Sequence, residues 1–251
     1  NSNVQFGEGG AGTFSDGKLN TLVKDVSGRN RKVLEVFVEH GAKEEILYMQ
    51  KPHIGTDRLC HIVKSMREEI VSLGGEVRFG TKVTDLKIGK NGAVKAVCLN
   101  EKEWLETKVV VLAIGHSARD TFETLVHRGV PMEAKAFAVG FRMEHPQSMI
   151  QESQYGVSAH KLPAAPYKVT AQTSSGRGVY SFCMCPGGYI IPAATSDGQL
   201  VVNGMSPSSR GGRWSNSGMV VEVRPEDIPA MLPAEQHDPA SPLLMMHLQE
   251  H

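Results

Sequence analysis

The sequence predicts an α/β protein with an inserted domain that is mainly antiparallel β (α+β). The first observation is a continuous, β-branched apolar run at residues 109–114, which is too short for a typical helix and is typical of a strand buried on both faces. The second is the texture of residues 137–205, where short strand candidates are separated by clusters of Gly, Pro and Ser. A parallel-sheet domain followed by an antiparallel one explains both.

The composition sets the class of protein. The chain has 251 residues, of which 40% are hydrophobic, so it can form one large domain or two smaller ones. Its 27 basic and 27 acidic residues balance, and both signs are scattered along the chain. This pattern argues against a nucleic-acid partner, and the lack of a long apolar run argues against a membrane partner. We expect a soluble protein that acts on a small molecule, with substrate and oligomeric state left open.

Four cysteines bear on the cellular compartment. Cys60, Cys98, Cys183 and Cys185 are too few and too unevenly spaced for a disulfide framework, so we expect a reducing compartment, the cytoplasm or a plastid. Cys183 and Cys185 alone cannot complete a zinc site, and we interpret them as packed thiols beside a turn, with a redox or substrate-facing role as the alternative. The chain begins without Met or a signal-peptide pattern, which predicts a fragment of a longer chain.

The densest local signal is a glycine-rich loop near the start of the chain. Glycine lets a backbone adopt positive φ angles and approach a ligand closely. The loop is no Walker motif, because Leu19 follows Lys18, and it is no dinucleotide fingerprint, because no strand precedes Gly7, Gly9 and Gly12. A flexible surface loop is the alternative. The candidate ligand-binding residues here are Gly7, Gly9, Gly10, Ala11, Gly12, Thr13, Ser15, Asp16, Gly17 and Lys18.

Two helices are predicted after this loop. Residues 31–40 form a short helical segment that Gly41 closes, and residues 57–73 carry apolar side chains at helical spacing. Thr56 is the expected N-cap of the second helix, and Cys60 in this helix is interpreted as an ordinary packing residue. His53 precedes a glycine turn and is a secondary candidate for facing a ligand, with an ordinary structural role as the alternative.

Short strands are predicted next. They lie at residues 76–79, 83–88 and 93–99, and Asn91-Gly92 is a strong hairpin turn between the last two. A third antiparallel strand at residues 104–107 leads into the apolar run.

The apolar run ends in a turn with the features of an anion site. Gly115 stops the predicted strand, and Ser117 or Asp120 is the expected N-cap of the helix that follows. Backbone N–H groups and the helix dipole converge at such a turn and can bind a phosphate. An ordinary strand–helix connection is the alternative. The candidate binding residues are Gly115, His116 and Ser117.

The rest of the chain divides by texture. The strand candidates are residues 137–143, 167–173, 179–184, 189–193 and 200–205, and residues 213–221 are expected to bring the chain back toward the first domain. The predicted organisation is a partial first domain at 1–130, an inserted substrate domain at 131–213, a return to the first domain at 214–228 and a poorly ordered tail at 229–251.

Four segments resemble the successive motifs of one family. They are residues 9–19 (GGAGTFSDGKL), 51–57 (KPHIGTD), 111–121 (VLAIGHSARDT) and 180–188 (YSFCMCPGG), with residues 138–147 and 203–206 in agreement. Over about residues 4–223 the chain resembles a largely uncharacterised family of FAD-dependent dehydrogenases, which are glutathione-reductase-like NAD(P)/FAD-dependent oxidoreductases of bacteria and plastid-bearing eukaryotes.

The resemblance implies part of a glutathione-reductase-like FAD-binding domain with an inserted β domain. It implies that the loop Gly7–Lys18 lies against the flavin and the pyrophosphate, that the strand at Val83 approaches the adenine, and that Gly115, His116 and Ser117 close over the cofactor. It also implies NADH or NADPH as a possible reductant, and it assigns no metal and no catalytic residue. Lys18 is expected to stabilise the reduced flavin.

The chain also departs from the family pattern. Members begin with a strand and a G-x-G-x-x-G turn that binds the ADP half of FAD, and they end with a second glycine-rich segment. Neither is found here, and the resemblance is expected to stop near Val223. The leading hypothesis is an FAD-dependent oxidoreductase or a fragment of one. The alternative is a non-catalytic remnant of a flavoprotein that acts as a binding or interaction module.

Overall fold

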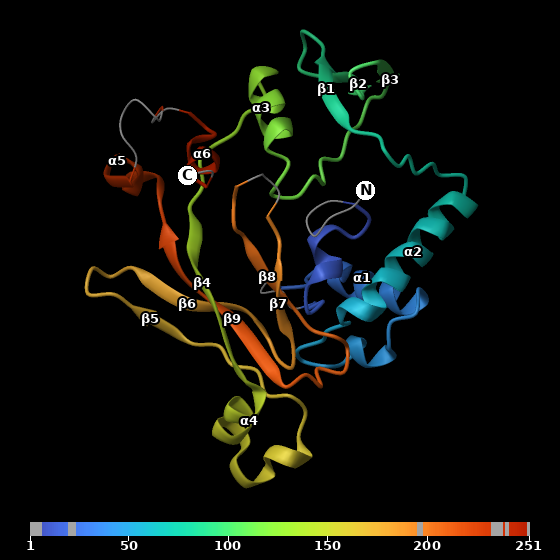
Figure 1. Cartoon of the computed structure of the whole chain (residues 1–251). Helices are drawn as coiled ribbons and strands as arrows, with labels where there is room; N and C mark the ends of the chain where they lie inside the picture. Colours follow the sequence, from blue (N-terminus) through green and yellow to red (C-terminus); the bar gives the residue numbers. More distant parts are fainter. Residues whose placement is uncertain (1–6, 20–23, 195–197, 232–237, 239–240, 250–251) are drawn as a thin grey trace. The chain divides into compact units, whose positions relative to one another are not determined.

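A computed structural model describes residues 7–19, 24–194, 198–231, 238 and 241–249 (Figure 1). The chain divides into two compact units, each made of two stretches of sequence. The first unit contains residues 1–77 and 140–221, and the second contains residues 78–139 and 222–251. The division into four segments that the sequence suggests stays a prediction.

Helices occupy the N-terminal part of the first unit. They are η1 (Gly10–Phe14), α1 (Arg29–Glu39), η2 (Glu44–Leu47) and α2 (Thr56–Ser72). Both predicted α-helices are confirmed to within two residues. Apolar side chains of both helices, among them Phe37 of α1 and Leu59 of α2, pack against a buried cluster formed by Ala42, Ile46, Ile54 and Ile62. Periodic apolar spacing was therefore a sufficient signal for this part of the fold.

Two details of α2 differ from expectation. Thr56 is the first helical residue, and the N-cap is Gly55, whose φ of 86° gives the backbone a path that β-carbon-bearing residues rarely take. The Thr56 hydroxyl donates instead to the backbone oxygen of Ser15. Cys60 is exposed rather than packed. Thr56 therefore connects the start of α2 to the glycine loop instead of capping the helix.

A four-stranded sheet with the order β4-β9-β6-β5 follows (Figure 1). Its strands are β4 (Phe137–Pro146), β5 (Thr170–Gln172), β6 (Gly178–Cys185) and β9 (Trp214–Val223). A separate hairpin pairs β7 (Tyr189–Pro192) with β8 (Val202–Met205), in antiparallel register. All the strands predicted beyond residue 136 are confirmed. The helices α4 (Gln147–Tyr155) and η3 (Gly156–Lys161), between β4 and β5, were not predicted.

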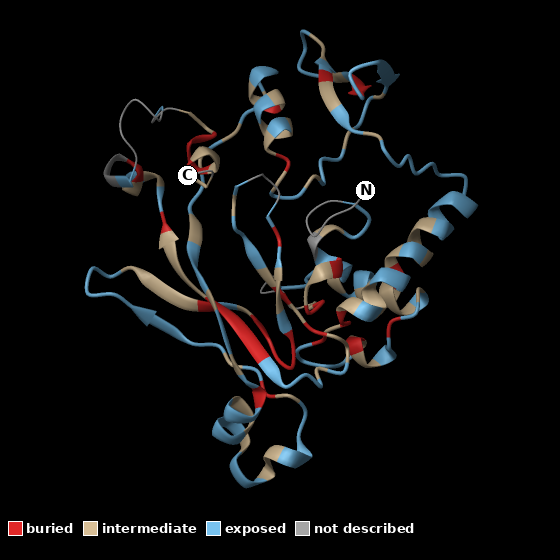
Figure 2. Cartoon of the chain, viewed as in Figure 1, coloured by how far each residue is buried: buried red, intermediate tan, exposed pale blue. Residues whose placement is uncertain are grey.

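The centre of β9 is buried although it is polar. Figure 2 shows this stretch of the strand in the colour of buried residues, and Ser215, Asn216 and Ser217 are fully covered. The neighbouring strand β6 carries a register irregularity between Phe182 and Cys185. Buried polar side chains need partners. This half of the sheet is therefore built around hydrogen bonds as well as apolar packing.

The second unit contains the predicted antiparallel meander. Strands β1 (Val83–Ile88), β2 (Val94–Leu99) and β3 (Glu103–Glu106) lie in that order. The helix α3 (Arg119–His127) packs on them, and Leu125 lies in one buried cluster with Leu86, Val97 and Leu99. The hairpin turn at Asn91-Gly92 is confirmed, with a φ of 76° at Gly92.

The predicted buried parallel strand is wrong. Residues 109–114 are not a strand, and the side chains of Val109 and Val111 are 77% and 84% exposed. Figure 2 shows most of this connection between β3 and α3 as exposed. A strand is completed by hydrogen bonds to a neighbour, and within the described residues no strand pairs with this run. The strand expected at residues 76–79 is absent as well.

The C-terminal region also differs from the poorly ordered tail that was expected. It contains η4 (Pro225–Asp227), α5 (Ile228–Met231) and α6 (Leu244–Leu248). Leu244, Met245 and Leu248 are buried in a cluster with Ile228 and Val223. The prolines of this region suggested a tail without periodicity, but a single helical turn rich in Leu and Met suffices to form a small core. Residues 232–237, 239–240 and 250–251 lie outside the described residues.

Candidate functional site

The glycine loop is shaped largely by its own packing. Gly7, Gly9, Gly10 and Gly17 have positive φ angles, and Ala11, Gly12 and Thr13 lie within η1. A β-carbon at Gly9 would lie 2.2 Å from Thr13 Cγ2, and one at Gly17 would lie 2.9 Å from the backbone nitrogen of Gly55. The packing of the loop itself therefore requires glycine at these two positions, whether or not a ligand binds.

The hydroxyl groups of the loop are also engaged locally. Thr13 Oγ1 donates to the backbone oxygen of Gly10 at 2.9 Å, and Ser15 Oγ donates to that of Gly12 at 3.0 Å. Ser15 Oγ in turn accepts from the backbone N–H of Gly17 at 3.1 Å. These bonds fix the turn that carries Asp16. The two hydroxyls thus support the loop rather than project from it.

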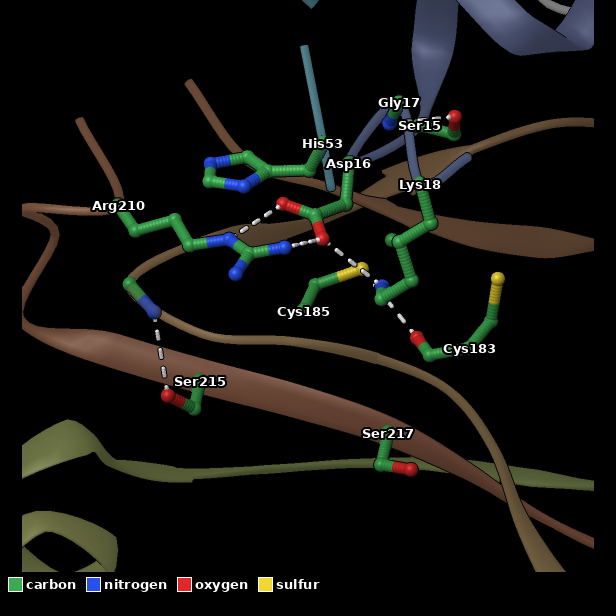
Figure 3. Close-up of polar contacts among 12 residues, drawn as sticks. Ser15, Asp16, Gly17, Lys18, His53, Cys183, Cys185, Arg210, Ser215 and Ser217 are labelled. Carbon is green, nitrogen blue, oxygen red and sulfur yellow. Dashed lines mark hydrogen bonds and ion pairs between the residues drawn. The ribbon is translucent and has the colours of Figure 1, made fainter. Parts of the chain in front are cut away.

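Asp16 is the centre of a charged cluster that joins two distant parts of the sequence (Figure 3). Its carboxylate is 1% exposed and accepts from Nε of Arg210 at 2.9 Å at one oxygen and from Nη2 of Arg210 at the other. Nζ of Lys18 lies 3.0 Å from Oδ2 of the same carboxylate. Two cations therefore share one buried anion.

The electrostatics of Asp16 follow from these contacts. Burial acts to raise the pKa of Asp16, but the hydrogen bond from Arg210 and the charges of Lys18 and Arg210 outweigh it and hold the pKa below its ordinary value. The carboxylate is therefore ionised at neutral pH. The Lys18 Nζ atom is buried and, apart from this ion pair, has no hydrogen-bond partner within the described residues.

His53 lies beside this cluster. A short antiparallel bridge joins Lys18 to His53, and the backbone N–H of Ile54 donates to the oxygen of Gly17 at 2.9 Å. The imidazole donates from Nε2 to the backbone oxygen of Ser208 at 3.3 Å. Burial, and then the charge of Arg210, lowers the pKa of His53 below its ordinary value, so the ring is neutral at neutral pH.

The two cysteines of β6 line the same region. Cys185 is fully buried, and its Sγ donates to the backbone oxygen of Cys183 at 3.2 Å. Burial raises the pKa of the Cys185 thiol, so it stays protonated. Cys183 has a φ of 51°, a conformation that is strained for a residue with a β-carbon. Both thiols are free; Cys185 is buried like a packed thiol, whereas Cys183 is half-buried, so the choice between packing and a substrate-facing role at Cys183 stays a prediction.

A polar network continues from Cys183 into the sheet. Nη1 of Arg142 donates to Oδ1 of Asn216 at 2.6 Å and to the backbone oxygen of Cys183 at 3.2 Å. Gly204 lets this guanidinium approach closely, because a β-carbon there would lie 2.3 Å from Nη1. Arg142 therefore stabilises the strained backbone of β6 at Cys183. Its place in the strand β4 gave no local signal of that role.

A cleft of about 610 Å³ opens beside Lys18 and Cys183, entirely within the first unit. We call it the basic pocket. Its lining residues are Lys18, Lys51, Gln154, Pro166, Tyr167, Lys168, Val169, Ser181, Phe182, Cys183, Met184 and Arg210. Four of these side chains are cationic. Of the four, the sequence singled out Lys18 alone as a binding residue; Lys51 only opens the family-like segment 51–57, and Lys168 and Arg210 lie in segments whose local sequence carries no signal.

The remaining predicted site residues belong to the second unit. Val83 opens β1 and pairs with Leu99, and Gly115 has a φ of 71°. His116 is exposed and Ser117 is half-buried. The N-cap of α3 is Ala118, so neither Ser117 nor Asp120 holds the expected position. These residues form no common site with the glycine loop inside either unit.

Known proteins resemble the part of the chain that contains the sheet. Residues 136–251 match a family model described as "FAD-dependent protein, C-terminal domain-like". The match runs from β4 through α6, so it includes Cys183, Arg210 and the C-terminal helices. It also continues past Val223, where the resemblance was expected to stop; that expectation was wrong.

A curated relative covers the whole chain. An uncharacterized protein of Clostridium beijerinckii is 49% identical over 253 residues, which include 100% of this chain and 45% of that protein. The chain therefore spans slightly less than half the length of this relative. Across the part of the chain that the structure describes, helices are too short or too polar to cross a membrane.

Proposed function

We propose that this chain is part of an FAD-dependent oxidoreductase, with the loop Gly7–Lys18 contributing to the flavin site. The observation that carries the proposal is the cluster of Asp16, Lys18 and Arg210. It joins the glycine loop to the segment that resembles FAD-dependent proteins. A loop with only a structural task has no need of a buried ammonium group whose one contact among the described residues is the ion pair with Asp16.

The residues present suit a flavin with a negatively charged edge. When bound, FAD supplies the hydride chemistry, and the protein supplies position and charge. Lys18 holds a positive charge at Nζ, Asp16 limits its mobility, and His53 presents a neutral ring beside them. In the second unit, the backbone of Gly115, His116 and Ser117 is the proposed contact to the cofactor, and Val83 the proposed contact to the adenine.

The test is a titration of the purified chain with FAD, followed by flavin fluorescence and visible absorption. We expect saturable binding that weakens in Lys18→Met and is unchanged in Lys64→Met, an exposed lysine of α2 that pairs with Glu68. NADH and NADPH are then added in turn to the loaded protein, because one of them is the proposed reductant. A chain that leaves the FAD signal unchanged contradicts the proposal.

One observation favours the alternative, a non-catalytic binding or interaction module. The run at residues 109–114 pairs with no described strand, so the turn at Gly115 has no sheet behind it. A protein that folds cooperatively, stays colourless and ignores FAD would support this module. Circular dichroism melting of the same sample separates that result from a failure to fold.

A further inference from the structure

The basic pocket carries an excess of positive charge. Lys18 and Arg210 share the single carboxylate of Asp16, so one positive charge remains uncompensated there. The side chains of Lys51 and Lys168 add two more, and neither makes an ion pair or hydrogen bond with any described residue. Of the residues that line the pocket, none is acidic. Converging cations without a counter-charge favour an anionic occupant.

The walls of the pocket are apolar. Pro166, Val169 and Met184 line it, together with the aromatic rings of Tyr167 and Phe182. The Tyr167 ring also contacts His145, with 5.4 Å between ring centroids, which fixes its orientation. The volume of about 610 Å³ is in the range of sites for small organic molecules. A free inorganic ion would leave these walls without a function.

We propose that the basic pocket binds a small organic anion that carries more than one carboxylate or phosphate group. Lys18, Lys51, Lys168 and Arg210 contact its charged groups, and Tyr167 and Phe182 contact its carbon skeleton. The binding itself does not depend on FAD. The assignment of this anion as the substrate of the oxidoreductase rests on the proposed function.

The test is calorimetric titration of the FAD-free chain with citrate and, separately, with pyrophosphate, at constant ionic strength set with chloride. We expect saturable binding of citrate, and pyrophosphate is the inorganic comparison. Lys51→Met and Lys168→Met should each weaken citrate binding about tenfold, because each removes a charge-assisted contact. Both side chains are exposed and form no ion pair with the described residues, so these variants keep the fold. Lys32→Met and Lys64→Met, at exposed lysines outside the pocket, are the matched controls.

The cysteines give a second readout at the pocket itself. Cys183 lines the pocket and is half-buried, whereas Cys60 is exposed on α2. Iodoacetamide labelling, measured by peptide mass spectrometry, should slow at Cys183 when the anion is present and stay constant at Cys60. Weak binding by both anions, or equal effects of the pocket and control variants, overturns the proposal.

The outcomes also separate this proposal from the flavin proposal. Citrate binding without FAD binding leaves the pocket proposal standing and contradicts the proposed function. FAD binding without anion binding supports the proposed function and overturns the pocket proposal. If pyrophosphate alone binds, and FAD displaces it, the pocket belongs to the cofactor's phosphates and the assignment to a substrate is overturned.

Discussion

The glycine loop of the first unit and the segment at residues 108–117 of the second have similar sequence signatures and opposite surroundings. Both contain glycine beside polar residues, and both are candidate ligand-binding turns by sequence. The C-terminal half of the loop is buried, where Gly17 lies against the backbone of Gly55 and Asp16 pairs with Arg210. The segment is exposed along most of its length. The difference comes from partners distant in sequence, since neither local pattern distinguishes a buried turn from an exposed one.

The largest expected effect comes from removing the buried negative charge of the glycine loop. Asp16→Asn leaves Lys18 and Arg210 without their shared counter-charge, and we expect a loss of about 3 kcal/mol in the free energy of unfolding. Glu68→Gln, which removes one member of an exposed pair, should cost under about 0.5 kcal/mol. Urea denaturation measures both. Equal costs would show that the buried cluster contributes no more than a surface pair.

The second comparison uses matched apolar truncations. Ile54 is 3% exposed beside the loop, and Ile54→Ala should cost about 2–4 kcal/mol through the cavity it leaves. Val111→Ala in the exposed segment should change stability by less than about 0.5 kcal/mol. A large cost at Val111 would mean that the segment is covered in solution, which would restore the buried strand that the sequence predicted.

The third comparison uses two glycines with nearly the same backbone angles. Gly17 has a φ of 64° and Gly115 a φ of 71°. An alanine at either position is strained by about 1 kcal/mol. At Gly17 the new β-carbon also meets Gly55, whereas at Gly115 nothing lies within 4 Å. Gly17→Ala should therefore be the more destabilising in thermal melts, and the reverse order would contradict the described loop.

The smallest effect is the pH dependence of the cluster. The pKa of Asp16 is lower in the folded chain than its ordinary value of 3.8, so its pairing stabilises the fold above about pH 4. This contribution is lost as the pH falls through the folded-state pKa. The difference in unfolding free energy between the native chain and Asp16→Asn should therefore be constant near neutral pH and shrink in acid. A constant difference down to acid pH would exclude Asp16 as the titrating group.

Local sequence was enough for elements that depend on periodicity. The helices α1 and α2 and the meander β1-β2-β3 follow from apolar spacing and one hairpin turn. It failed at residues 109–114, because an apolar run predicts burial only where a neighbouring strand exists. It also missed α6, whose single turn is too short to show a period.

Local sequence likewise predicted only those residues of the candidate site that stand in a recognisable motif. Asp16 and Lys18 stand in a dense glycine motif, which drew attention to them. Arg210 stands in a Ser/Gly-rich loop that predicts nothing except a turn. Only the folded chain brings its guanidinium to Asp16. Lys168 is an ordinary surface lysine by sequence, and Lys51 stands at the edge of the family-like segment 51–57 without a predicted role; both acquire significance from the pocket they share.

The separation of Asp16 and Arg210 along the chain has a kinetic consequence. The two residues are 194 positions apart, so the contact closes a very long loop. Contacts of this kind form late, because the entropy of loop closure is lost before they contribute. During synthesis, Asp16 leaves the ribosome long before Arg210 is made. The glycine loop therefore cannot form its ion pair with Arg210 until most of the first unit has been synthesised. The first unit should therefore fold slowly, and only after Arg210 has been synthesised.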